Sequence, residues 1–240
     1  IGAIDFTSEN SSGDEHDFLN LTARMRDVTA GSEDVSFAYT AFINGTGREI
    51  QSFVNTAASA ASMVFNEDSQ DIDFRVESNA HTNMFFIDGG NDGIGIGNST
   101  IIDWSTNYPG LQMGQAGALY GHKSSNQMNF AMNWGVTTGN VYIADGIASR
   151  MIMDTSKISF DSSASGSAGG AITGINILQM TTSGSVFNED SGDLDFRVES
   201  DGNANMFVVN AGANGVGIGT DNPGTRELKV NNASNQSDIT

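Results

Sequence analysis

The chain of 240 residues has no cysteine and only two prolines, and its 10 lysines and arginines are outnumbered by 29 acidic residues. Without cysteine there is neither a disulfide framework nor a thiolate metal site. A net charge of −19 repels phosphate backbones, so we expect no nucleic-acid partner. No apolar run approaches the ~20 residues that a spanning helix needs, and no signal-peptide pattern is present. We therefore expect no membrane insertion.

Large apolar residues are also scarce. Leucine, isoleucine, valine and phenylalanine together make up 53 of 240 residues, close to the level at which a core becomes thin. The chain is nevertheless not typical of disorder, because its apolar residues alternate regularly with polar ones. We expect an all-β chain whose own core is insufficient and which buries its strands against copies of itself.

The sequence contains one block twice. Val64–Gly97 and Val186–Gly219 align without a gap at an offset of 122 residues, and 21 of the 34 aligned positions are identical. Repetition of this kind usually indicates a stacked or elongated architecture. The expected fold is an elongated homotrimeric β-structural fibre with two copies of a β-repeat module.

Each copy shows two strand patterns. In the first copy, Ile72, Phe74 and Val76 alternate with charged residues, and the segment 93–97 alternates glycine with isoleucine. Glycine at every second position leaves one strand face without side chains, which permits close approach of another backbone. We expect the glycine face to lie where three chains crowd together at a three-fold axis.

The repeated block and the changes in composition along the sequence divide the chain into five parts. They are a β-hairpin unit (1–55), the first β-repeat copy (56–103), an aromatic-containing β spacer (104–180), the second copy (181–230) and a polar tail (231–240). The chain starts at Ile1 rather than at methionine and ends in the polar tail, so we expect it to be a segment of something longer.

Some assignments in these parts stay open. Leu19, Leu21 and Met25 fit the alternation of a strand, although the same stretch also fits a helical face, and we favour a hairpin with residues 35–43. Residues 54–62 could form a short helix, which Asn, Thr and Ser would weaken. The segment 149–163 is typical of two strands with a turn near Asp154, and the small residues of 163–174 are either a flexible joint or tightly packed backbone.

Several segments resemble those of a known family. SENSSGDEHDFLNLTARMRDVTAGSED (8–34) and FAYTAFINGTGREI (37–50) resemble recurrent segments of phage tail fibres and tail spikes. The repeat core NEDSxDxDFRVES is similar to modules in tail fibres of marine phages. VGIGTDNPGTRELKV (216–230) resembles the strand-turn-strand that precedes a self-cleaving chaperone domain in many such fibres, although only ten polar residues follow Val230 here.

The resemblance implies a homotrimer on the outside of a virion tail. Its partners would be other tail proteins and a host-surface glycan or protein receptor, and its role would be structural or in host attachment. In such a trimer we expect the apolar residues of both copies to form the common core. These are Ile72, Phe74, Val76, Phe85, Ile94, Ile96, Leu194, Phe196, Val198, Phe207, Val216 and Ile218.

Two alternatives to a structural fibre belong to other functional classes, a binding protein and an enzyme. In a carbohydrate-binding adhesin, Trp104, Tyr108, Trp134 and Tyr142 could stack on sugar rings, although these side chains equally suit the core of the spacer. A polysaccharide depolymerase needs two carboxyl groups ~5–10 Å apart around a sugar cleft. The acids here lie mainly in repeated or turn segments, so we do not expect an enzyme.

No cofactor or metal is expected. The acids Asp68, Asp71 and Asp73, with their second-copy counterparts 190, 193 and 195, could hold Ca²⁺, but their spacing matches no EF-hand. Solvated turn residues paired with Arg75 and Arg197 are the simpler interpretation, with salt bridges across strands or between chains. The three histidines (His16, His81 and His122) are isolated in the sequence.

Overall fold

The computed structural model describes residues 2–57, 60–224 and 228–230, and every regular element in these ranges is a β-strand. The predicted all-β class is confirmed. Over the same ranges there is no helix long and apolar enough to cross a bilayer. The chain forms two compact units, Ile1–Asn91 and Asp92–Thr240, and each is described by itself.

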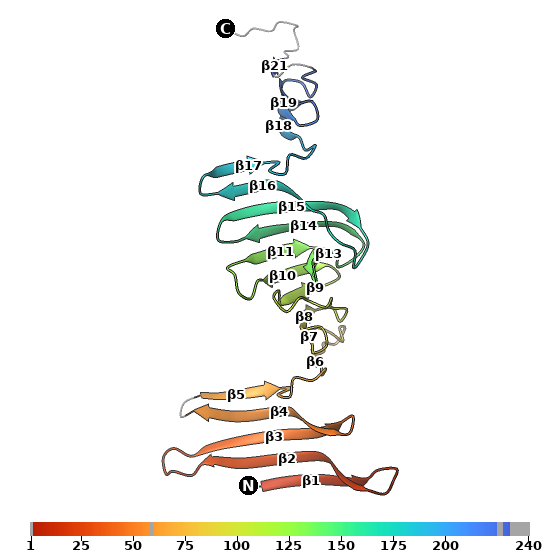
Figure 1. Ribbon diagram of the computed structural model, residues 1–240, viewed down its shortest axis with the longest axis vertical. Coiled ribbons are helices and arrows are strands. Elements are labelled where there is room, and N and C mark those ends of the chain that lie inside the picture. The colour runs from red at the N-terminus through yellow and green to blue at the C-terminus, as the bar shows by residue number, and fades with distance from the viewer. Residues whose placement is uncertain (1, 58–59, 225–227, 231–240) are drawn as a thin grey trace. The chain divides into compact units, whose positions relative to one another are not determined.

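The first unit consists of a five-stranded sheet followed by a small hairpin (Figure 1). The sheet has the order β1-β2-β3-β4-β5, with every neighbouring pair antiparallel. Strands β6 and β7 pair as the hairpin, with Phe74 opposite Ile87. The strands of this unit are β1 (Gly2–Glu9), β2 (Glu15–Asp27), β3 (Asp34–Ile43), β4 (Thr46–Ala57), β5 (Ala60–Phe65), β6 (Phe74–Val76) and β7 (Phe85–Asp88).

Local sequence explains the hairpins of this sheet. Ile43 pairs with Thr46 across a two-residue loop, in which Asn44 and Gly45 have φ angles of 48° and 75°. Positive φ at both central residues is the geometry of a type I′ turn, which matches the twist of the flanking strands. The strand interpretation of residues 18–27 is confirmed and the helical alternative is wrong, because pairing with β1 and β3 requires the two-residue period.

The possible helix at 54–62 is also not formed in the described residues of that segment, although 58 and 59 lie outside them. Strand β4 extends to Ala57 and β5 begins at Ala60. Phe53 pairs with both Phe37 and Met63, so the cross-strand contacts of the sheet outweigh the weak local preference of the small residues.

In the second unit the largest sheet has the order β17-β16-β15-β14-β11-β10-β9-β8. Its neighbours are antiparallel except β8 and β9, which are parallel. Figure 1 shows β14 to β17 stacked in sequence order, with β13 beside β11. The strands are β8 (Gly93–Ile96), β9 (Gly110–Met113), β10 (Gly117–Gly121), β11 (Met128–Met132), β12 (Gly135–Val136), β13 (Asn140–Val141), β14 (Gly146–Met153), β15 (Lys157–Gly166), β16 (Ile175–Thr181) and β17 (Gly184–Phe187).

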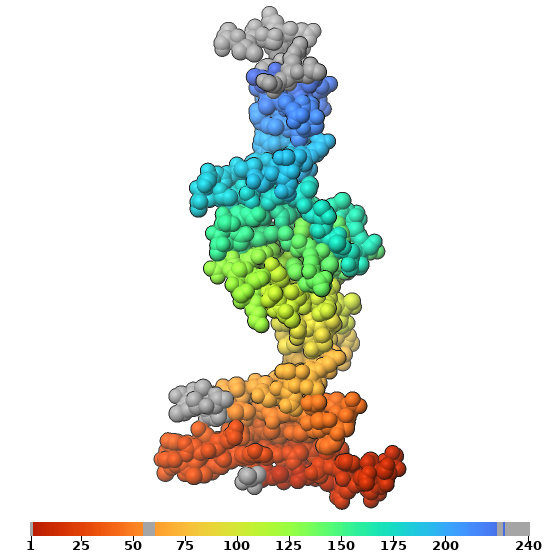
Figure 2. Space-filling view, in the orientation of Figure 1, coloured from red at the N-terminus to blue at the C-terminus, as the bar shows by residue number. Residues whose placement is uncertain are grey.

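A smaller sheet follows in the same unit. It has the order β18-β19-β20-β21, with the last pair parallel, and consists of β18 (Phe196–Ser200), β19 (Asn203–Asn210), β20 (Gly215–Ile218) and β21 (Leu228–Val230). Figure 2 shows the part of this unit in green and teal as broader than the part in blue that contains these short strands. The difference follows from strand length, since β15 has 10 residues and β20 has four.

The two faces of the large sheet differ in whether other segments of the same unit cover them. One face is covered by segments of the same unit that follow β8, β11 and β15. Trp104, Trp134 and Tyr142 from these segments are buried over the sheet together with Tyr120 and Ala148. The Tyr142 hydroxyl lies 2.7 Å from Ser163 Oγ and donates to the Ala164 carbonyl at 2.6 Å. This layer is the core of the unit.

Glycine permits this covering layer to lie close to the strands. A Cβ on Gly110 would lie 2.2 Å from Trp104, and one on Gly166 would lie 2.2 Å from Tyr142. Within 163–174, Gly166 and Gly174 are therefore tightly packed against Tyr142 and Trp134, whereas Gly169 has open space around it.

The expectation for the Gly-Ile alternation is wrong. A Cβ on Gly93 would lie 2.3 Å from Ile101, and one on Gly95 would lie 2.3 Å from the Asn98 carbonyl oxygen. The glycine face is thus occupied by the same chain, directly after the strand. The exposed face of β8 is instead the one that carries Ile94 and Ile96.

The packing around Gly110 gives a stability prediction. We expect Gly110→Ala to lower the free energy of unfolding by about 1–3 kcal/mol, because the new methyl group must displace a buried indole. Gly139→Ala is the matched control, since no atom lies within 4 Å of its Cβ position and its φ is outside the left-handed region. Urea unfolding followed by circular dichroism measures both. Equal stability of the two variants would contradict the packing described here.

Candidate functional site

The candidate functional surface is the face of each sheet that its own unit leaves open. In the second unit one row of paired residues crosses eight strands on this face, and every member is apolar. The row consists of Ile94, Leu111, Leu119, Phe130, Met151, Phe160, Leu178 and Phe187. All eight side chains are half-buried or exposed. We call this the open face of the second unit.

The rows beside it have the same character. Met128, Met153, Ile158 and Met180 form a second row over four strands, and Ile96, Met113 and Met132 extend a third. The third row continues through Ser149 and Ser162, so the open face is a broad, largely apolar surface rather than a few scattered side chains. Surfaces of this extent mark interaction sites in soluble proteins.

The sheet of the first unit has a similar open face. Cross-strand partners on it include Ile4, Leu21 and Tyr39 in one row and Ala23, Phe37, Phe53 and Met63 in another. Their chain neighbours on the opposite face are largely polar. Met63 is 60% exposed and Ile4 is 59% exposed, which is unusual for large apolar side chains in a regular sheet.

The whole chain has an excess of exposed apolar surface. Among the described residues, 32 large hydrophobic side chains are exposed, whereas the buried hydrophobic set has 12 members. The accessible surface is 15160 Å². Folded monomers of 25.2 kDa expose about 10,300 Å², and even two separate domains of half that mass would expose only about 12,400 Å². One chain by itself therefore leaves much of its apolar surface in water.

The residues predicted to form the core of an assembly lie partly on such open surface. Val76, Ile94, Ile96, Val198, Phe207 and Ile218 are exposed, and Ile72, Phe74, Phe85, Leu194, Phe196 and Val216 are half-buried. Their rings contact one another within each copy. Phe74 lies 5.1 Å from Phe65 and 6.4 Å from Phe85, and Phe196 lies 4.7 Å from Phe187 and 6.3 Å from Phe207, measured between ring centroids.

A tight turn lies between Phe65 and Phe74 in the first copy and between Phe187 and Phe196 in the second. Asn66 accepts a hydrogen bond from Gln70 N at 2.8 Å and donates to the Gln70 carbonyl at 2.6 Å, and Asn188 does the same with Gly192 at 2.8 and 2.7 Å. Both asparagines adopt positive φ, 64° and 63°, which asparagine tolerates better than most residues.

The acids of the repeat anchor backbone. Asp68 Oδ2 accepts from Glu49 N at 2.9 Å, and Asp190 Oδ2 accepts from Asn176 N at 2.7 Å. Asp73 and Asp195 likewise accept from the backbone of Gly89 and Ala211. No group of three or more possible metal ligands occurs within the described parts of the chain.

The arginines of the repeat pair differently from expectation. Arg75 bonds Glu77 and Arg197 bonds Glu199, two residues along the same strand edge rather than across strands. Each of these four side chains is about half exposed, so the pairs contribute little to stability.

Three of the four aromatic residues considered for glycan contact are in the core. Trp104, Trp134 and Tyr142 are buried and leave no ring face open to solvent, whereas Tyr108 is half-buried and packs against Tyr120 and His122. The structure does not bring the four rings together into one exposed platform.

A buried ion pair lies on the covered face. Arg150 Nε donates to Asp161 Oδ2 at 3.0 Å, with side chains only 14% and 11% exposed. The Arg150 guanidinium also lies 4.1 Å from the centre of the Trp134 ring, a cation–π contact. Burial raises the pKa of the nearby Tyr120 phenol, and the positive charge of Arg150 opposes that rise.

Sequence reasoning missed this pair, although a signal for it existed. Asp154 caps the β14–β15 turn by accepting from Ser156 N and Lys157 N, and these bonds lower its pKa, most strongly the bond from Ser156. Counting outward from that turn places Arg150 opposite Asp161, as the register shows. The period of the strands does not reveal which face is covered, so burial of the pair was not predictable.

Comparison of the chain with protein-family models, with curated proteins and with solved structures finds no match. The functional argument therefore depends on the surfaces and contacts described above.

The buried ion pair gives a prediction with an internal control. Asp161→Asn leaves the largely buried Arg150 charge without its counter-ion, so we expect the free energy of unfolding to fall by about 1.5–3 kcal/mol, the contribution of a hydrogen bond to a charged group. Glu199→Gln breaks an exposed pair in the same unit and should change it by about 0.2–1 kcal/mol. Chemical unfolding of both variants tests this, and a loss below 1 kcal/mol for Asp161→Asn contradicts the network.

Proposed function

We propose that this chain is a structural subunit of a phage tail fibre, in which three copies assemble along a common axis through their open faces. The observation that carries the proposal is the unbroken apolar row across eight strands of the second unit. A surface of this kind needs a cover, and identical copies of it provide one for each other.

The free energy of burying apolar side chains strongly favours association of the chains. Fully burying one Val, Leu, Ile, Phe or Met side chain contributes ~1.5–3 kcal/mol. A few of the exposed residues on the open faces therefore suffice to outweigh the entropy that association costs, and an obligate assembly of this type has no stable folded monomer. The number of three chains comes from the resemblance to tail fibres, since the open face itself supports any arrangement that covers it.

The repeated segments support a fibre rather than a globular oligomer. Matching turns, backbone anchors and phenylalanine contacts occur in the two copies, and the repeated block begins in each copy on the second strand of an antiparallel hairpin, β4–β5 or β16–β17. We interpret the copies as two equivalent collars of one shaft. In a tail the shaft would link other tail proteins to a host receptor on the outside of the virion.

The proposed assembly has a defined mass in solution. We expect light scattering to report three times the chain mass, and Phe130→Glu to abolish that assembly because it would place three charges in one apolar core. The matched control is Thr138→Glu, which adds the same charge at an exposed position on a loop of the same unit. Since Phe130 is 46% exposed in the single chain, an unassembled protein would tolerate Phe130→Glu. A stable monomer in the unmutated protein would overturn the proposal.

The proposed assembly also determines how fast each methionine is oxidised. Met25, Met63, Met113, Met128, Met132, Met151, Met153 and Met180 lie on the open faces, whereas Met84 and Met206 lie elsewhere and are 42% and 49% exposed. We expect peroxide to oxidise Met84 and Met206 at least several-fold faster than the open-face group in the assembled protein. Peptide mass spectrometry measures the rates. Equal oxidation of the two groups before denaturation would count against covered open faces.

A further inference from the structure

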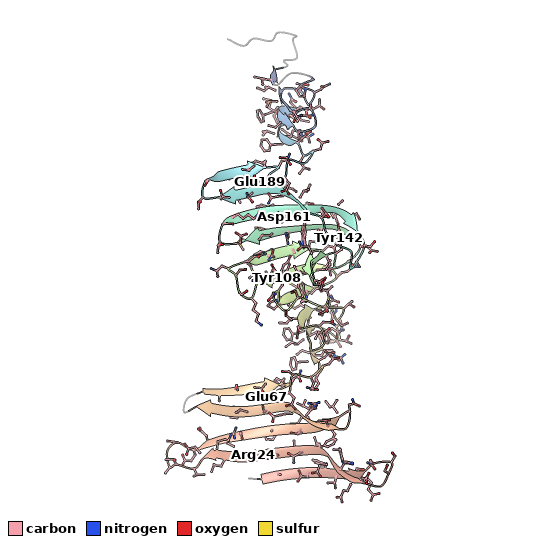
Figure 3. All side chains as sticks on the ribbon, viewed as in Figure 1. Arg24, Glu67, Tyr108, Tyr142, Asp161 and Glu189 are labelled. Carbon is pink, nitrogen blue, oxygen red and sulfur yellow. The ribbon has the colours of Figure 1, made fainter. Side chains whose placement is uncertain are left out.

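Strand β2 of the first unit separates its charges along its length. Glu15 and Asp17 lie at the end that adjoins the β1–β2 loop, whereas Arg24 and Arg26 lie toward the β2–β3 loop. Figure 1 shows these two loops at opposite ends of the sheet, and Figure 3 shows Arg24 on β2. All four side chains are exposed. We call the two groups the acidic end and the arginine end.

The two ends are too far apart to meet within one chain. Asp17 is paired with Thr7 on β1 and Arg24 with Ser36 on β3, both on the face of the sheet opposite the open face. Seven residues of β2 separate Asp17 from Arg24, which corresponds to ~23 Å along a strand. An ion pair between the acidic end and the arginine end therefore needs two chains.

The acidic end contains a like-charge pair without a counter-ion. Glu9 lies directly opposite Glu15 across β1 and β2, with Asp17 two residues further along. Like charges directly opposite each other in a sheet are destabilising. The ion pairs of the described residues all lie elsewhere, so no arginine or lysine among those residues compensates these carboxylates. A cation supplied by another molecule would relieve the repulsion.

The arginine end has the opposite deficiency. Arg24 and Arg26 form no ion pair with any described residue, although acidic residues outnumber basic ones by 29 to 10 in the chain. Two acids beside them already bind backbone. Asp27 accepts a hydrogen bond from Thr29 N at 2.8 Å, and Glu33 accepts one from the same loop at 2.9 Å. The two guanidinium groups are therefore available to carboxylates of a partner.

We propose that the acidic end of β2 in one copy binds the arginine end of β2 in the next copy, so that the sheets of the first unit close head to tail. A contact between two different surfaces repeats from copy to copy and closes into a ring. Copies with a net charge of −19 repel one another, and this contact places opposite charges where their sheets meet. The inference rests on the proposed function, because it requires open faces turned toward one axis with β2 running across that axis.

This contact sets the order of the copies rather than the strength of their association. Exposed ion pairs contribute little to stability, because water and salt screen them. The apolar open faces supply the driving force, but burial of apolar surface has no direction and allows the copies to meet in several ways. Complementary charge restricts them, since any arrangement that brings two acidic ends together adds repulsion.

Charge reversal in the full chain tests the contact. At a fixed urea concentration, Arg24→Glu with Arg26→Glu should raise the chain concentration at which half of the trimer dissociates by at least about tenfold, because like charges then meet at every interface. Glu15→Arg with Asp17→Arg should act in the same direction, although it makes the chain less acidic and so lowers the overall repulsion between copies. All four reversals together should restore the unmutated value within about twofold. Additive losses in the fourfold variant would overturn the proposal.

A control variant and salt exclude other causes. Arg75→Glu with Arg197→Glu makes the same change of charge at two exposed arginines outside this contact, and it should shift the midpoint by less than about threefold. Circular dichroism checks that each variant is folded. Salt at ~1 M shortens the range of charge interactions to about 3 Å, so it should narrow the difference between the unmutated protein and the double arginine variant. A difference that salt leaves unchanged contradicts an ionic contact.

A cross-link identifies the direction of closure. The chain has no cysteine, so Glu15→Cys with Arg26→Cys introduces two unique thiols. In one chain these positions lie at the two ends of β2, about 35 Å apart along the strand, so a bismaleimide of much shorter span joins them only between copies. A denaturing gel should show covalent dimers and trimers for the double variant and only monomers for each single variant. Dimers from a single variant, or a double variant that stops at dimers or monomers, would refute head-to-tail closure.

Light scattering on the unmutated protein keeps the two hypotheses apart. A trimer whose two ends show neither coupling nor covalent closure refutes the charged contact alone and leaves the fibre intact. A monomer refutes the proposed fibre and the charged contact with it.

Discussion

The structure depends on one constraint: the chain supplies a cover for only one face of its main sheet. Segments carrying Trp104, Trp134 and Tyr142 pack over that face, and glycine on the strands permits their close approach. On the other face the row from Ile94 to Phe187 has no cover within the second unit. A sheet of this composition is incomplete as a single chain, and association of copies is the simplest completion.

The covered face is where polar chemistry is possible. It contains the Arg150–Asp161 pair and the anchored amide of Asn176, which are held by hydrogen bonds within one chain, together with the buried aromatic rings. The open face consists mainly of apolar side chains and has few groups that form directional hydrogen bonds. In the proposed fibre this separation leaves assembly of the second unit to the open face.

The repeated turns have a local structural role rather than a binding role. Asn66 and Asn188 close their turns, while Asp68 and Asp190 fix those turns to the preceding hairpins. The acids that suggested calcium therefore already satisfy backbone N–H groups. The same contacts of Asn66 and Asp68 recur at Asn188 and Asp190, so these identical positions of the two copies have the same structural role.

Sequence by itself determined the strands, because alternation with a period of two is visible in Leu19, Leu21 and Met25, and turn residues such as Asn44 and Gly45 mark the hairpins. It also indicated that one chain has too little apolar content for a closed core. The tertiary structure alone decided which face each strand buries. A period of two defines two faces of a strand but does not say which of them a distant segment will cover. Only the long-range packing of the segments between strands decides that the glycine face of β8 is covered and that the rings of Trp104 and Trp134 are buried.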